Sequence, residues 1–171
     1  NGEWSALTEA TFHRSPDIPA LCIREIMYNP AGPPALEFVE LENVGDLPVD
    51  LNQMSLRGIG FTFAEGAVLA AGERLVLASN DNLDAFTAHY PGVDVFGTFS
   101  GSLSNGGERL RILDSLGNTV HSVRYADSEG WPTTPDGGGH SLVLLNPDAD
   151  SNDAANWSAS VNEDGSPGEP E

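Results

Sequence analysis

Short apolar runs separated by turn residues dominate the chain, and this pattern predicts strands. Within residues 36–42 alternate side chains fall on opposite faces, so Glu37 shares a face with Val39 and Leu41. Clusters of Gly, Pro, Asn and Asp end each run, as turns between strands require. The same reasoning predicts nine short strands, at residues 21–28, 36–42, 48–51, 54–57, 61–63, 73–79, 109–113, 120–125 and 140–145.

One short helix is predicted near residues 81–90. Asn80 or Asp81 can cap it, apolar residues recur at helical spacing, and Pro91 ends it. Nine short strands with a single short helix favour an all-β fold. We expect an antiparallel β-sandwich with immunoglobulin-like character.

The two ends of the chain differ from the middle, so three segments are predicted. Residues 1–19 form a strand-like piece, with Leu7 and Phe12 as apolar anchors, followed by a Pro-containing linker. Residues 20–157 form the sandwich. Residues 158–171 are polar and rich in Gly and Pro, and we expect an acidic extended tail. The start at Asn-Gly-Glu-Trp, without Met or an apolar leader, is typical of a piece of a longer protein.

The charge of the chain limits its partners. The 171 residues include 26 acids and 7 bases, all of them arginine, for a formal net charge of -19. Nucleic acids and anionic membranes need a basic face, so neither is an expected partner. No apolar run is long enough to span a bilayer. We expect stability to rise with salt, which screens the repulsion among the acids.

Four glutamates lie on two strands that we expect to be neighbours: Glu25, Glu37, Glu40 and Glu42. Paired carboxylates could perform acid–base chemistry or hold a cation. Structural pairing with solvated edge residues is the favoured interpretation. Because Glu37 shares a face with apolar residues, we expect it to be partly buried and paired with an arginine.

A candidate calcium loop follows the last predicted strand. Its oxygen ligands fall at alternate positions, at Asp148, Asp150, Asn152 and Asp153. The Gly and the final acid of a complete loop are missing, since their places hold Asp153 and Ala159. An Asx-rich turn that leads into Trp157 is the favoured alternative. No other cofactor is predicted.

No catalytic residue is predicted. The four histidines lack the spacing of a metal site, no serine stands in a nucleophile elbow, and the Gly-rich stretch 101–107 lacks the Lys of a phosphate loop. Trp4, Trp131, Trp157 and Phe99 could form a platform for a sugar. For Trp131 and Trp157 we favour a place in the core.

The order and spacing of several motifs resemble the lamin tail domain family in its bacterial form, over residues 20–168. The matching stretches are 23–30, 37–43, 49–51, 54–56, 99–108, 131–132, 136–142, 156–157 and 165–168. The resemblance implies an immunoglobulin-like sandwich without intrinsic catalysis, placed beside other domains in secreted or surface proteins. Residues 1–13 look like the closing strand of a preceding domain.

The first functional hypothesis is therefore a non-catalytic structural or protein-interaction module of a secreted or cell-surface bacterial protein. Its partners would be other domains of the polypeptide or other copies of the chain. One alternative is a filament or assembly subunit joined through the N-terminal strand, by Trp4, Leu7 and Phe12. Another is a calcium- or carbohydrate-binding accessory domain beside a hydrolase.

Overall fold

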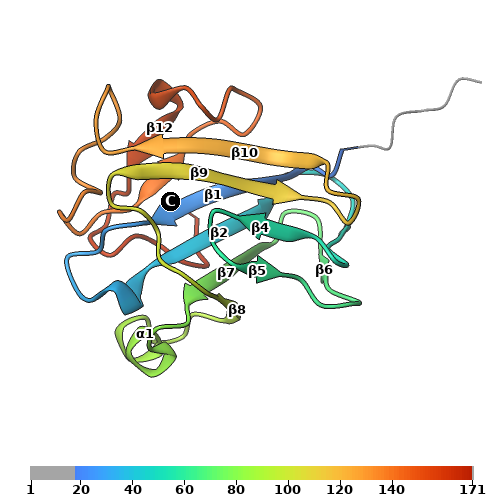
Figure 1. The fold of residues 1–171 in the computed structure, drawn as a ribbon, viewed down its shortest axis with the longest axis horizontal. Coiled ribbons are helices and arrows are strands. Elements are labelled where there is room, and N and C mark those ends of the chain that lie inside the picture. The colour runs from blue at the N-terminus through green and yellow to red at the C-terminus, as the bar shows by residue number, and fades with distance from the viewer. Residues whose placement is uncertain (1–17, 171) are drawn as a thin grey trace, which may run out of the picture.

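Two facing β-sheets and a two-stranded ribbon form the molecule in the computed structural model, which describes residues 18–170 (Figure 1). The six-stranded sheet has the order β12-β11-β1-β2-β7-β8 and the four-stranded sheet the order β10-β9-β4-β5. The ribbon joins β3 to β6.

The larger sheet consists of β1 (Leu21–Met27), β2 (Phe38–Asn43), β7 (Arg74–Ser79), β8 (Val95–Phe99), β11 (Leu142–Leu144) and β12 (Trp157–Ala159). The smaller sheet consists of β4 (Ser55–Arg57), β5 (Phe61–Thr62), β9 (Gly107–Leu113) and β10 (Thr119–Ala126). The ribbon strands are β3 (Val49–Asp50) and β6 (Val68–Leu69).

The main core lies between the two sheets and is built from alternate strand residues. Ile23, Val39 and Leu75 of the larger sheet belong to one buried cluster with Leu110 and Ile112 of the smaller sheet. Each such side chain contributes about 1.5–3 kcal/mol when it leaves water. The shared face predicted for Val39 and Leu41 is confirmed, and it points into this core.

A second apolar cluster lies on the outer face of the six-stranded sheet. Helix α1 (Leu83–His89) covers this face, and Phe86 and Tyr90 pack against Phe38. The Asn82 side chain caps the helix by accepting the Ala85 N–H at 3.1 Å. The predicted helix is confirmed, but the predicted caps Asn80 and Asp81 are wrong because Asn82 is the residue that reaches this N–H.

All nine predicted strands are present, with β6, β8 and β12 in addition. One pairing departs from the predicted antiparallel order, since β7 and β8 run parallel with α1 between them. The extended tail predicted at 158–171 is also corrected. Ser158 and Ala159 belong to β12, and the chain beyond them folds back onto the outer face of the larger sheet.

Within residues 18–170, no helix is long and apolar enough to cross a bilayer.

Candidate functional site

Acidic side chains are buried on the outer face of the six-stranded sheet, beside the apolar cluster. Glu25 of β1 lies opposite Glu40 of β2 in the strand register, and their exposed fractions are 1% and 0%. The prediction that these two strands are neighbours is therefore confirmed. Two ionisable groups this deep need partners within the protein, because burial without them costs several kcal/mol.

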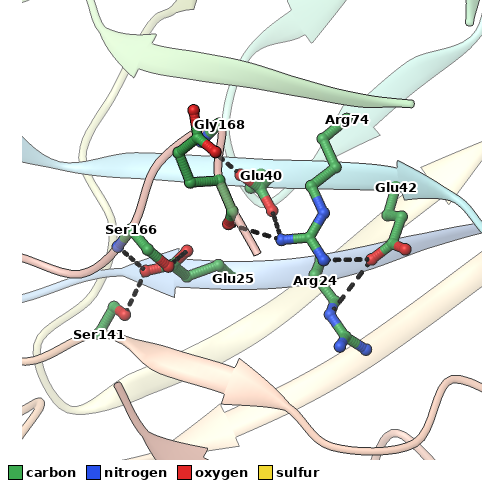
Figure 2. Close-up of polar contacts among 9 residues, drawn as sticks. Arg24, Glu25, Glu40, Glu42, Arg74, Ser141, Ser166 and Gly168 are labelled. Carbon is green, nitrogen blue, oxygen red and sulfur yellow. Dashed lines mark hydrogen bonds and ion pairs between the residues drawn. The ribbon is translucent and has the colours of Figure 1, made fainter. Parts of the chain in front are cut away.

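Two arginines supply part of that pairing. Arg74 of β7 contacts Glu40 through Nη1 at 3.0 Å and Glu42 through Nη2 at 3.2 Å. Arg24 of β1 adds a contact from Nε to Glu42 at 3.2 Å (Figure 2). The strands β1, β2 and β7 are adjacent, so the ion pairs run across the middle of the sheet.

The C-terminal strap, defined here as residues 160–170, supplies further donors (Figure 2). The Ser166 N–H donates to Glu25 at 3.0 Å, and the Gly168 N–H donates to Glu40 at 2.6 Å. The Ser141 hydroxyl also donates to Glu25, from the end of the sheet where β11 begins. Residues far apart in the sequence are thus joined at two carboxylates.

The strap also accepts a hydrogen bond from the same network. Arg74 Nη1 donates to the Glu169 carbonyl oxygen at 2.8 Å, so one guanidinium holds both Glu40 and the strap. The His89 ring at the end of α1 lies 3.1 Å from the Asp164 carboxylate. These contacts tie the strap to β1, β2, β7 and the helix.

Burial changes the acidity of Glu40. It raises the pKa of this carboxyl to about 7, while the Gly168 N–H and Arg74 act in the opposite direction. Glu25 opposite adds to the rise through repulsion between two negative charges.

Glu37 lies in a separate place and has a different partner. It is 3% exposed and accepts the Leu103 N–H at 2.8 Å. Burial raises the pKa of this carboxyl to about 7. The predicted arginine partner of Glu37 is wrong, since a backbone N–H takes that role. Arg74 pairs with Glu40 and Glu42.

Glu25 and Glu40 have a structural role, as buried acceptors of hydrogen bonds. Their oxygens accept hydrogen bonds from Ser141, Ser166, Gly168 and Arg74, and neither side chain is exposed. General acid–base work needs a group within reach of a substrate. The network instead fastens the end of the chain to the central strands.

The predicted calcium loop lies against the edge of the smaller sheet. Asn152 accepts the Arg124 N–H of β10 at 3.0 Å, and the Ser151 hydroxyl donates to the Ser122 carbonyl at 2.7 Å. Strand β10 is an edge strand, and these contacts cover its outward backbone groups. The loop therefore protects a sheet edge.

The acids of this loop make turn contacts. Asp150 accepts the Asn152 N–H at 2.9 Å, and Asp153 accepts the Ala155 N–H at 3.0 Å, while Asp148 is exposed. In residues 18–170, no group of three or more His, Cys, Asp or Glu side chains is arranged to hold a metal ion. Calcium binding at Asp148, Asp150, Asn152 and Asp153 stays a prediction.

The aromatic candidates divide between the core and the segment that lies outside the described residues. Trp131 and Trp157 are buried with their ring centroids 5.9 Å apart, and Phe99 is fully buried. The place in the core predicted for Trp131 and Trp157 is confirmed. Trp4, Leu7 and Phe12, predicted for the N-terminal strand, lie outside the described residues 18–170.

Comparison with known proteins agrees with this architecture. The family model of the lamin tail domain matches residues 14–127. No match was found among curated proteins. The matched region ends after β10, and the structure adds β11 and β12 to the six-stranded sheet, with the strap on the outer face of that sheet. Lamin tail domains are a non-catalytic, immunoglobulin-like family. Since the match spans most of the 171 residues, the chain belongs to the lamin tail domain family.

Proposed function

We propose that the chain is a non-catalytic structural and protein-interaction module of a secreted or cell-surface, multidomain bacterial protein. The observation that carries this proposal is the use of the deepest acids, Glu25 and Glu40, to hold the C-terminal strap. A site that turns over substrate keeps such groups within reach of a cleft. Here they anchor the chain end to three central strands.

A module of this kind works by shape and stability. The two-sheet core gives a rigid body, and the strap fixes where the chain leaves the sheet. The strap would thus set the direction in which a following domain or linker continues. The supporting contacts are the Gly168 N–H to Glu40 and the Arg74 hydrogen bond to the Glu169 carbonyl oxygen.

Two measurements test the proposal. The full chain should show no turnover of chromogenic esters, glycosides and phosphodiesters, with Glu25→Gln and Glu40→Gln as matched variants. Turnover that either variant abolishes would contradict the non-catalytic proposal. Protease treatment of intact source cells, followed by detection with an antibody to this chain, should degrade it. Complete protection until the cells are lysed would contradict a surface location.

Assembly through the N-terminal strand is the second candidate. It is favoured by an exposed apolar surface where the described chain begins: Ile18 is 71% exposed and Leu47 is 76% exposed. Both residues line one surface pocket with Pro19, Pro48 and Val49. Sedimentation of the full chain and of a variant lacking residues 1–14 tests it. Assembly that persists without these residues would contradict this candidate.

Ligand binding at the loop stays a third, narrower prediction. Calorimetric titration of the full chain with calcium, with Asp148→Asn/Asp150→Asn as the control, measures it directly. A glycan array tests carbohydrate binding in the same way.

A further inference from the structure

Four arginines gather on the outer face of the four-stranded sheet, on three adjacent strands. Arg57 lies on β4, Arg109 and Arg111 on β9, and Arg124 on β10, and all four side chains are exposed. Residues between them, such as Leu110, point into the core. We call these four residues the arginine face.

The strand register places like charges directly opposite one another. Arg57 faces Arg111 across β4 and β9, and Arg109 faces Arg124 across β9 and β10. Cross-strand pairs of equal charge destabilise a sheet. An acid beside them would remove that penalty, and the chain has 26 acids against 7 bases.

In the part of the chain that the structure describes, no such acid is present. Among residues 18–170, none of the four guanidinium groups lies within 4.0 Å of a carboxylate, whereas Arg24 and Arg74 on the other sheet both form ion pairs. More than half of the arginines in the chain therefore form a face with unneutralised repulsion. Burial does not account for the missing ion pairs, because all four arginine side chains are exposed to solvent.

The spacing of the arginine face suits an extended peptide. Arg109 and Arg111 are alternate residues of one strand, so their Cα atoms are roughly 6.8 Å apart, the same repeat as alternate residues of an extended peptide. A guanidinium group binds a carboxylate through two parallel hydrogen bonds. Carboxylates at alternate positions of a peptide lying along β9 would match both arginines.

The charge of the rest of the molecule selects a short partner. A long polyanion such as nucleic acid would extend beyond the arginine face and meet the remaining acids of a chain with net charge -19. A short acidic segment contacts only the arginines. We propose that the arginine face binds an extended acidic segment of a partner protein, with carboxylates at alternate positions. This inference rests on the proposed role as a protein-interaction module and names its binding surface.

Fluorescence anisotropy with a labelled peptide of alternating Glu and Thr tests the inference. The full chain should bind this peptide at low salt, and Arg109→Gln/Arg111→Gln should bind it about tenfold more weakly, since two charged contacts are lost. Binding should also weaken as salt rises through about 0.15 M. The melting temperature of the variant should equal or exceed that of the wild type, because the substitutions remove the repulsion between opposed arginines.

A matched control has the same net charge as this variant. Asn80→Asp/Asn162→Asp likewise lowers the net charge by two, at exposed positions attached to the other sheet, and should bind like the wild type. Equal binding by the arginine variant and the wild type would overturn the proposal. Tighter binding of a single-stranded oligonucleotide or a sulfated glycan than of the peptide would overturn the assigned partner. The peptide test and the tests of the proposed function are independent. If the wild type does not bind the peptide, this inference fails. The proposed function fails only on the hydrolysis or surface-location results.

Discussion

At the scale of residues, single buried carboxylates join distant parts of the chain. Glu40 has no exposed side-chain surface and receives a backbone N–H on one oxygen and Arg74 on the other. Burying an ion pair adds little net stability, whereas removing one partner leaves the other charge without compensation. The residue is therefore costly to remove.

Replacing Glu40 by Ala should lower the free energy of unfolding by about 2–4 kcal/mol at mildly alkaline pH, because Arg74 and the Gly168 N–H lose their acceptor. Urea denaturation measures this. The exposed Glu65→Ala is the matched control and should change stability by less than about 0.5 kcal/mol. Equal effects of the two substitutions would contradict the role assigned to Glu40.

Glu37 should make stability depend on pH. Burial raises its pKa from 4.5 to about 7, so between these values the folded protein binds more protons than the unfolded chain. Its contribution is fully present below the unfolded pKa and is lost as pH rises through the folded pKa. Burial lowers the pKa of His121 to about 4, which acts in the opposite direction as pH falls below 6.5.

Comparison of the wild type with Glu37→Gln isolates the glutamate. The variant keeps an acceptor for the Leu103 N–H but does not titrate. Its free energy of unfolding, relative to the wild type, should therefore rise as pH increases from about 5 to about 8. Urea denaturation at a series of pH values measures the difference. A difference that stays constant across this range would contradict the prediction.

At the scale of elements, the C-terminal strap is bound to the outer face of the larger sheet. Its path depends on Gly165, which has φ of 73° and lies against the Glu25 carboxylate and the Phe38 ring. A Cβ atom there would meet Glu25 Oε1 and disturb the anchoring network. Space and backbone conformation both require glycine at this position.

Two glycines with the same φ allow these effects to be separated. Gly72 also has φ of 73°, but a Cβ there would meet no atom within 4 Å. Gly72→Ala should cost about 1 kcal/mol for the backbone conformation alone, and Gly165→Ala should cost about 2–3 kcal/mol because of the added contact. Thermal or urea unfolding of the two variants measures the difference. Equal costs would show that the strap does not press on Glu25.

The elements themselves were largely predictable from the sequence. Strands such as β1 and β7 are long and apolar, so the pattern of their residues places them well. The sequence does not predict β8, because Gly97 interrupts its short apolar run. The strand also lies at the edge of the sheet, where alternate residues are exposed. The strap was missed because its polar composition is typical of a solvated tail, while its contacts come from backbone N–H groups.

The candidate site was predictable only in part. Alternation placed Glu25 and Glu40 on neighbouring strands, but sequence alone does not show which residues donate to them. Ser166 lies 141 residues from Glu25, and Gly168 lies 128 residues from Glu40. A useful signal would have been acids on the outer face of central strands together with a polar segment, Gly165–Gly168, whose backbone N–H groups can donate to them.

On the scale of the whole molecule, charge is divided between the sheets. The larger sheet pairs Arg24 and Arg74 with buried acids, and the smaller sheet presents the arginine face to solvent. The excess acids occupy turns and the chain end. Net charge therefore describes the surface as a whole and hides an exposed basic region.

The melting temperature should rise as sodium chloride increases from about 0.01 M to about 0.3 M. Salt screens repulsion among the 26 acids and also between the opposed arginines, while the buried ion pairs are screened much less. Differential scanning calorimetry measures it. A melting temperature that falls over this interval would show that exposed ion pairs outweigh the net repulsion.

The pairing of β1 with β11 has a consequence for synthesis on the ribosome. Strand β1 emerges first among the described elements, but Ser141, which donates to Glu25, follows 116 residues later, and the strap follows after that. A nascent chain therefore carries an open sheet and uncompensated acids until residues 141–168 have been synthesised. Such long-range closure is slow compared with local pairing. The larger sheet should thus close late, only after residues 141–168 have left the ribosome.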